Sequence, residues 1–321
     1  MTTLTQRLFP LEPQYRERVW GGRRLKASDP PIGEAWVAFG ESRVRGGAHA
    51  GRTVTELASL YGAPFLGRDV AAMHGARFPL LVKLLDCADW LSVQVHPDDE
   101  QAARLVGPGE FGKCEAWHFL EAEEGATVYA GVRPGTSKVE LERAIREGRV
   151  LEVAERLEVR AGETVFIPAG TLHSLGPGLL IYELQQSSDT TFRVYDWGRP
   201  ASTGRKLHVE ESVEVTDPRK GANVHPAPAL VGTSAAAALH CTHFGLDMVR
   251  VGETAFEGDT NGRSFHLLTA VEEETDVSCG GESIRLGRFE TLLLAGGAGA
   301  YELRTQGGVA KVLRAKVPPS F

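Results

Sequence analysis

Short apolar segments separated by glycine and proline run through most of this chain, which has 37 glycines and 17 prolines among its 321 residues. Runs of about four to eight such residues between turn formers are typical of β-strands. We expect strands at 34–38, 80–85, 91–95, 116–120, 127–130, 164–167, 179–184 and 192–196. Many short strands without regularly alternating helices favour a barrel or a two-sheet sandwich over an α/β fold.

Helical periodicity is present in three segments. Residues 53–61 begin with a threonine that can cap a helix, and residues 98–106 follow a proline. Apolar residues also recur at helical spacing through 138–157. We expect these three helices to be inserts on a β scaffold.

A domain boundary is expected in the segment 217–229, where Pro218, Gly221, Pro226 and Pro228 disfavour regular structure. A second β-rich portion follows, with strands expected at 264–269, 291–294 and 309–313. It lacks the histidine, glycine and glutamate spacings found earlier in the chain. We therefore expect a catalytic domain at 1–225 and a related, metal-free β-rich domain at 226–321.

Composition is that of a globular protein, with a net charge of -7 and no basic run. Such a balance disfavours nucleic acid or an anionic membrane as partner. The four cysteines form no CxxC pair, so neither a disulfide framework nor a cysteine-zinc site is indicated. The N-terminus lacks the apolar core of a signal peptide, and no apolar run approaches the ~20 residues of a membrane span. We expect a cytoplasmic protein, and leave open whether it is a monomer or a homodimer.

The segment 90–99 places Gln94 and His96 two residues apart in an expected strand. Because side chains alternate along a strand, both should project from the same side. Two more candidate ligands, Glu115 and His173, follow beside turns of the same expected barrel. The sequence therefore predicts one Gln/His/Glu/His metal site per chain.

A Pro-Ala-Gly turn at 168–170 lies three residues before His173. This spacing is similar to the second metal motif of the cupin superfamily, a group of small jelly rolls also called double-stranded β-helices. In the first cupin motif Gln94 stands where a histidine is usual, and Glu115 lies well downstream of His96. Two imidazoles, a carboxylate and an amide suit Zn²⁺ and tolerate Mn²⁺, Fe²⁺ or Co²⁺. With no thiolate and one weak ligand, the set is typical of a catalytic metal.

Charged residues near the expected ligands indicate an anionic substrate. Lys113 lies two residues before Glu115, and Ser92 two residues before Gln94, so each should share a strand face with a ligand. The segment 182–199 is unusually polar for a β-rich core. Four of its charged side chains could line one pocket: Glu183, Asp189, Arg193 and Arg199.

The chain resembles the type I phosphomannose isomerases, also called mannose-6-phosphate isomerases, in their shorter bacterial form. The resemblance rests on six segments: 19–22, 32–36, 91–99, 112–115, 168–173 and 185–197. They cover roughly residues 10 to 200 in the family's order, whereas the last third matches only in general character.

This resemblance implies a cupin-type fold and a zinc-dependent, reversible conversion of mannose 6-phosphate to fructose 6-phosphate. It implies zinc ligands at Gln94, His96, Glu115 and His173. It also implies an active-site lysine at Lys113, an arginine at Arg193, a glutamate at Glu183, and phosphate contacts at Ser92 and Arg199.

Aldose–ketose isomerisation moves a proton between adjacent carbons through a cis-enediol, so it needs one base that reaches both carbons. Lys113 could be that base if the site holds its amine neutral, and Glu183 could act as a carboxylate. We favour Lys113. Arg193 would then stabilise the developing negative charge.

Two other functions remain open at this stage. A cupin oxygenase would hold Fe²⁺ on His96, Glu115 and His173, but it would have no use for Gln94 or for the cations Lys113 and Arg193. A non-catalytic sugar-phosphate-binding cupin would have lost its proton-transferring groups, and here those groups are present.

Overall fold

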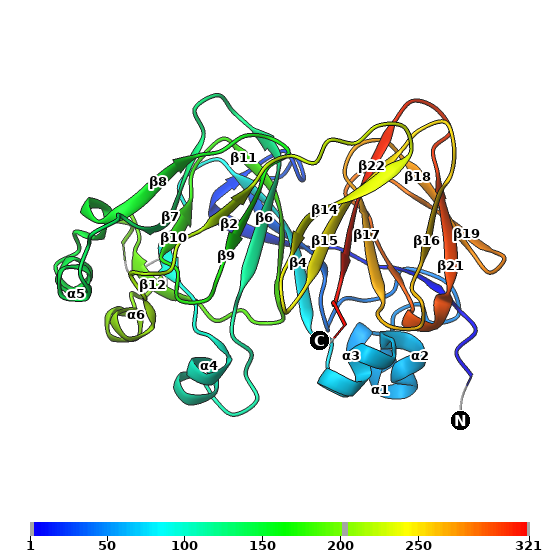
Figure 1. Ribbon diagram of the computed structural model, residues 1–321, viewed down its shortest axis with the longest axis horizontal. Coiled ribbons are helices and arrows are strands. Elements are labelled where there is room, and N and C mark those ends of the chain that lie inside the picture. The colour runs from blue at the N-terminus through cyan, green and yellow to red at the C-terminus, as the bar shows by residue number, and fades with distance from the viewer. Residues whose placement is uncertain (1–2, 201–204, 320–321) are drawn as a thin grey trace. The chain divides into compact units, whose positions relative to one another are not determined.

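The computed structural model describes residues 3–200 and 205–319, and the chain divides into two compact units (Figure 1). Unit 1 contains Met1–Tyr15, Ala35–Leu84 and Ala227–Phe321, and unit 2 contains Arg16–Glu34 and Leu85–Pro226. The units therefore do not follow the expected linear division into 1–225 and 226–321. The last point at which the chain passes from one unit to the other, after Pro226, does fall within the expected boundary segment.

The first segments of the chain join unit 1 through backbone pairing. Strand β1 (Leu8–Pro10) pairs antiparallel with β20 (Thr291–Leu294), with Leu8 opposite Leu294. The amide of Phe265 also donates to the carbonyl of Leu66, and the amide of Arg68 to Gly262. These pairings join parts of the chain that are distant in sequence.

Two sheets carry the strands of unit 2. One has the order β12 (Phe192–Tyr195), β5 (Val93–Val95), β10 (His173–Leu175), β7 (Thr127–Val132) and β8 (Ala154–Glu158). The other has the order β13 (Asn223–His225), β9 (Thr164–Ile167), β6 (Glu115–Ala122), β11 (Leu179–Gln186), β4 (Leu80–Cys87), β2 (Gln14–Gly22) and β3 (Ile32–Ala38), of which the last three have residues in both units. Buried Trp117, Phe119, Val128 and Ile181 belong to the apolar core of this unit.

Unit 1, like unit 2, consists mainly of β-sheets. One sheet has the order β1, β20, β17 (His266–Ala270), β22 (Ala310–Lys316), β15 (Gly245–Val251) and β14 (Ser234–His240). The other has the order β16 (Phe256–Asp259), β21 (Ala300–Arg304), β18 (Thr275–Cys279) and β19 (Glu282–Leu286). The expected mainly β, cupin-type fold is confirmed, and each expected strand overlaps an observed one.

Helices begin where the sequence offers a cap. Helix α1 (Val54–Tyr61) starts after Thr53 and α4 (Asp99–Leu105) after Asp98, each with a reciprocal capping box. Both confirm expected helices. The remaining helices are α2 (Ala63–Leu66), α3 (Arg68–His74), α5 (Lys138–Arg146), α6 (Val209–Val215) and the short 3₁₀ turns η1 (Val150–Glu152) and η3 (Gly296–Ala298). In Figure 1, α1, α2 and α3 cluster together, and α5 lies beside α6.

The expected helix at 138–157 is wrong in its second half. Helix α5 ends before Gly148, whose φ of +69° is a backbone conformation that favours glycine. The chain then forms η1 and enters β8, which pairs with β7 and, after the buried Ala154, alternates half-buried and exposed positions. The boundary segment differs too, because β13 lies inside it and pairs with β9. No helix in the described ranges is long and apolar enough to cross a membrane.

Candidate metal centre and active site

The expected metal ligands come from both sheets of unit 2. His96 follows β5 directly, and His173 is the first residue of β10, which pairs with β5 so that His173 lies opposite Gln94. Glu115 is the first residue of β6 in the other sheet, opposite Gln185 of β11. The fold therefore brings together residues that are 77 positions apart in the chain.

Nearly equal distances separate the two imidazoles from each other and from the Glu115 carboxylate, which faces one ring with each of its oxygens. Nε2 of His96 lies 3.2 Å from Nε2 of His173 and 3.3 Å from Oε2 of Glu115. Nε2 of His173 lies 3.2 Å from Oε1 of Glu115. Ligands bound tetrahedrally at about 2.0–2.1 Å from a zinc ion are about 3.3–3.4 Å apart, so the imidazole–imidazole distance and the distance from each imidazole to one carboxylate oxygen are close to the spacing around such an ion. All three side chains are buried.

Backbone carbonyls orient both imidazole rings. Nδ1 of His96 lies 2.8 Å from the carbonyl oxygen of Thr190, and Nδ1 of His173 lies 2.8 Å from that of Thr171. A carbonyl only accepts, so Nδ1 carries the proton and Nε2 keeps its lone pair. Burial, together with Lys113, lowers the pKa of His96 to about 3, and burial lowers the pKa of His173. Both rings are therefore neutral ligands at pH 7.

The same convergence supports a bound cation. The Nε2 lone pair of His173 and the Oε1 atom of Glu115 face each other at 3.2 Å, and Oε1 is buried without a hydrogen-bond donor among the described residues. Such an arrangement of acceptors is unfavourable unless a positive charge lies between them. Burial alone would raise the pKa of Glu115, but the Lys113 ammonium and the two imidazoles hold it well below its usual range. The carboxylate is thus available as an anionic ligand.

Gln94 lies at the edge of this cluster. Its Nε2 atom is 3.3 Å from Nε2 of His173, and the hydroxyl of Ser92 donates to its Oε1 atom at 3.4 Å. A half-turn of the amide exchanges the two atoms and would direct the oxygen at the cluster. The neighbouring strand β12 places Arg193 opposite Gln94.

Lys113 reaches the cluster although it precedes β6. Its ammonium donates to Oε2 of Glu115 at 2.7 Å and to Nε2 of His96 at 2.9 Å. Gly112 sets this position, because a Cβ there would lie 2.5 Å from the backbone of Asp98. The sequence argument had the right contact but assigned it to strand alternation instead of to this close backbone approach.

Glu183 lies on the same face of β11 as Gln185, opposite Trp117 of β6. The indole of Trp117 donates to Oε1 of Glu183 at 3.3 Å, and its ring lies 5.4 Å from that of His173. Trp117 therefore connects the glutamate to the metal cluster. It could have been noticed in the sequence, since it follows Glu115 by two positions.

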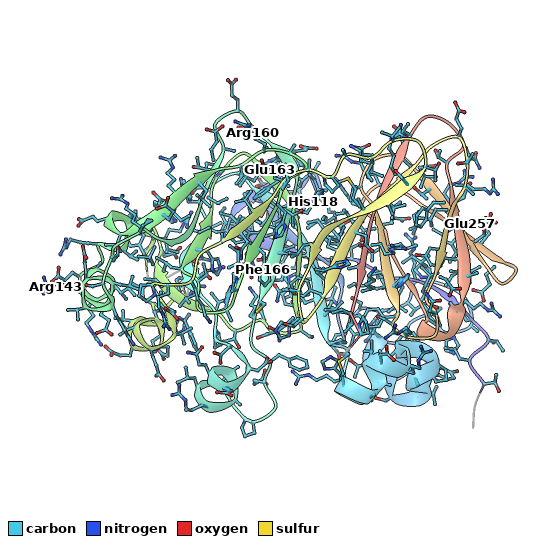
Figure 2. All side chains as sticks on the ribbon, in the orientation of Figure 1. His118, Arg143, Arg160, Glu163, Phe166 and Glu257 are labelled. Atoms are coloured by element: carbon cyan, nitrogen blue, oxygen red, sulfur yellow. The ribbon has the colours of Figure 1, made fainter. Side chains whose placement is uncertain are left out.

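A further buried histidine, His118, takes no part in the cluster. Figure 2 shows His118 and Phe166 on neighbouring strands β6 and β9. Strand alternation puts His118 on the opposite face of β6 from Glu115, and its Nδ1 atom lies 2.9 Å from the Thr164 hydroxyl.

The expected phosphate contacts form two groups. Nε of Arg193 donates to the Ser92 hydroxyl at 3.3 Å, and its Nη1 donates to the carbonyl of Lys206. Arg199 is bound instead to Asp196 at 3.1 Å and to Asp89 at 2.8 Å.

Asp196 also binds Arg205, which sequence reasoning missed, at 2.6 Å. Burial and the nearby Arg205 lower the pKa of Arg193. Two arginines thus bind the buried Asp196 carboxylate and Arg193 lies within reach of its charge, so that with Asp89 the group keeps one positive charge in excess. Asp189 is exposed in the loop after β11, and it is the carbonyl of the next residue, Thr190, that contacts the cluster.

Comparisons with known proteins agree with this geometry. Residues 8–111 match the family model described as phosphomannose isomerase type I, catalytic domain. A mannose-6-phosphate isomerase of Streptococcus mutans is 41% identical over 68% of this chain and 70% of its own length. The mannose-6-phosphate isomerase ManA of Bacillus subtilis is 33% identical over 93% of this chain and 96% of its own length.

A crystal structure of the mannose 6-phosphate isomerase from Bacillus subtilis superposes with a TM-score of 0.82 at 27% identity, covering 97% of this chain and 99% of that one. The similarity therefore extends over the whole chain, including the last third, where the sequence resemblance was only general. The chain belongs to the type I phosphomannose isomerases, the mannose-6-phosphate isomerase family.

Proposed function

We propose that this protein is a zinc-dependent aldose–ketose isomerase that interconverts mannose 6-phosphate and fructose 6-phosphate. The observation that carries the proposal is the contact of one buried ammonium, that of Lys113, with two ligands of a three-residue metal cluster. This contact brings a proton-transferring group to the place where a metal would bind sugar oxygens. In an iron oxygenase the Lys113 ammonium would have no function.

The residues present fit zinc. His96, Glu115 and His173 would hold it, and Gln94 would be the fourth ligand after its amide group turns. With one carboxylate in the set, the zinc site would have a net charge of +1. When bound, zinc would polarise the oxygens on C1 and C2 of the sugar. Lys113 and Glu183 are both buried in unit 2, so the fold largely excludes water from these two side chains.

We assign the proton transfer to Lys113, which in its neutral amine form takes the proton from C2 of the aldose, becomes an ammonium, and returns the proton to C1 through a cis-enediol. Glu183 is the alternative base, and its Oε1 atom accepts a hydrogen bond from Trp117. Arg193 would stabilise the negative charge that develops on the enediol oxygens. Both candidate bases are buried in unit 2, and substitution of each in turn distinguishes them.

The phosphate would bind at the arginine group, where Ser92 and Arg193 are already in contact. Arg199 could contribute by exchanging its exposed partner Asp89 for the phosphate, while Asp196 and Arg205 hold the loop. Asp189 stays a prediction from the sequence. So do the cytoplasmic location, the lack of a nucleic-acid partner and the monomeric or dimeric state.

We further propose that catalysis is confined to unit 2. Within the described ranges, the one group of three or more histidine, cysteine or acidic side chains with metal-ligand spacing is His96, Glu115 and His173. Unit 1 then has another role.

The function is tested by turnover of mannose 6-phosphate, measured by coupled detection of fructose 6-phosphate before and after chelation. We expect turnover to fall by at least about 10³-fold on chelation, because Lewis-acid stabilisation contributes several kcal/mol. Added Zn²⁺ should restore it. A zinc-loaded protein that turns over no aldose phosphate would overturn the proposal.

Replacing Gln94 by histidine tests the fourth ligand. Gln94→His should still bind metal, because imidazole is a stronger ligand than an amide, but it should change the metal preference and slow turnover by about tenfold. Metal content after dialysis against mixed Zn²⁺, Mn²⁺ and Co²⁺ and kcat for each metal form would be compared with those of the unchanged protein. Identical preferences and rates would remove Gln94 from the ligand set.

A further inference from the structure

A second polar cluster lies inside unit 1, on one face of the sheet that contains β17, β22 and β15. His266 pairs with Lys316, and two positions along β17 Leu268 pairs with Arg314. Asp247 of β15 lies opposite Arg314 on the other side. Because side chains alternate, all five project from the same face. The next positions on that face are buried and apolar: Ala270, Val312 and Val249.

Two cations of this cluster share one carboxylate oxygen. Arg314 donates to Oδ2 of Asp247 from Nε at 3.0 Å and from Nη2 at 2.8 Å, and Lys316 donates to the same oxygen at 2.7 Å. The guanidinium also lies 5.5 Å from the centre of the Phe256 ring. The group therefore has one excess positive charge, and Arg314 is held in a fixed position.

A chain of hydrogen bonds leads from Arg314 to His266. Nη1 of Arg314 donates to the Tyr301 hydroxyl at 3.2 Å, and this hydroxyl lies 3.0 Å from Nδ1 of His266. Burial, with Arg314 and Lys316, lowers the pKa of His266 to about 3, so the ring is neutral at pH 7. We infer that this hydroxyl, which accepts from Arg314, donates its own proton to Nδ1. Nε2 of His266 then carries a hydrogen, and within the described ranges no residue accepts it.

A cavity of about 290 Å³ adjoins these donors. His266, Arg314 and Lys316 line it, and Arg263 contributes a further cation at its rim, where it is paired with Asp69. The exposed Asp259 also lies on the lining. The cavity thus combines two cations that share one carboxylate, a neutral donor without an acceptor, and a volume suited to a small molecule.

We propose that this cavity of unit 1 binds a small molecule through an oxyanion group, either a phosphate or a carboxylate, which accepts from His266, Arg314 and Lys316. Both groups offer the several acceptor atoms that these donors require. The site is independent of the metal centre and of the reaction proposed for unit 2.

The imidazole of His266 is the reporter for the test. The full-length, zinc-loaded protein is titrated with inorganic phosphate and, separately, with malonate, while the ring ¹⁵N and ¹H resonances are followed by NMR and assigned with His266→Gln. We expect saturable shifts with at least one anion, and the anion with the higher affinity identifies the group. Lys316→Gln should weaken binding by at least about tenfold, because it removes a charged donor.

Lys311→Gln is the matched control, because Lys311 lies on the opposite face of the same strand from Arg314 and Lys316 and pairs with Glu272. It should leave the affinity unchanged. Tyr301→Phe, which keeps the ring but breaks the chain of hydrogen bonds to His266, should weaken binding as well and serves if Lys316→Gln does not fold. The proposal fails if neither anion shifts the His266 resonances saturably, or if the folded variants titrate like Lys311→Gln.

Discussion

Replacing Glu115 by glutamine should remove most of the bound zinc and reduce turnover by at least about 10³-fold. Glu115 is the anionic ligand of the cluster, and its loss removes the Lewis acid together with the negative charge that balances it. The substitution should also destabilise the fold, because the Lys113 ammonium, 3% exposed, would lose the carboxylate that it contacts at 2.7 Å. Breaking a buried ion pair costs about 3–5 kcal/mol.

Metal content by mass spectrometry, kcat and the melting temperature would be measured for Glu115→Gln and for Glu121→Gln. Glu121 lies on the same strand but is 43% exposed, so its substitution should change none of the three beyond a small loss of stability. A Glu115→Gln protein that retains stoichiometric zinc would show that this carboxylate is not a ligand.

Replacing Lys113 by methionine should separate proton transfer from metal binding. We expect kcat to fall by about 10²–10⁴-fold, the range for removal of a general base, with zinc still bound by the three ligands. Deuterium from solvent should no longer enter C1 or C2 of the sugar. Glu183→Gln is the contrasting variant, because it removes the other candidate base and keeps Lys113 in contact with Glu115.

Chelation adds a second readout for the same variant. In Lys113→Met the Glu115 carboxylate stays buried and would lose its last cation when zinc is removed, so chelation should lower the melting temperature more than in the unchanged protein. Wild-type exchange rates in zinc-loaded Lys113→Met, together with loss of exchange in Glu183→Gln, would move the base to Glu183.

Much of the site was predictable because its residues lie beside backbone signals. His96 precedes Pro97, and His173 follows the turn at 168–170, so their positions at strand ends could be inferred. The acceptors that orient the two rings could not, because they are the carbonyls of Thr171 and Thr190, which carry no side-chain signal. The sequence thus indicated both histidines as candidate ligands, but it did not indicate which ring nitrogen carries the proton.

The fold class followed from the spacing of apolar segments, but the membership of the two units did not. The partner of Leu8 is Leu294, and no local pattern in a three-residue strand identifies so distant a neighbour. The second half of the expected helix at 138–157 failed for another reason. Gly148 favours an end to α5, but the apolar residues beyond it continue at a spacing that fits a helix. In the short stretch of β8 the same spacing also fits a strand, so the sequence did not distinguish the two.

The division of the chain between the units also sets the order in which they can be completed during synthesis. All residues of unit 2 have been made once the ribosome reaches Pro226, whereas unit 1 needs the segment that begins at Ala227. Until then the apolar residues of α1 and α2, among them Leu57 and Phe65, lack the strands that complete their unit. Unit 2 can thus fold first, while the N-terminal segment of the nascent chain still exposes apolar side chains. Binding of a chaperone to that segment would protect it from aggregation.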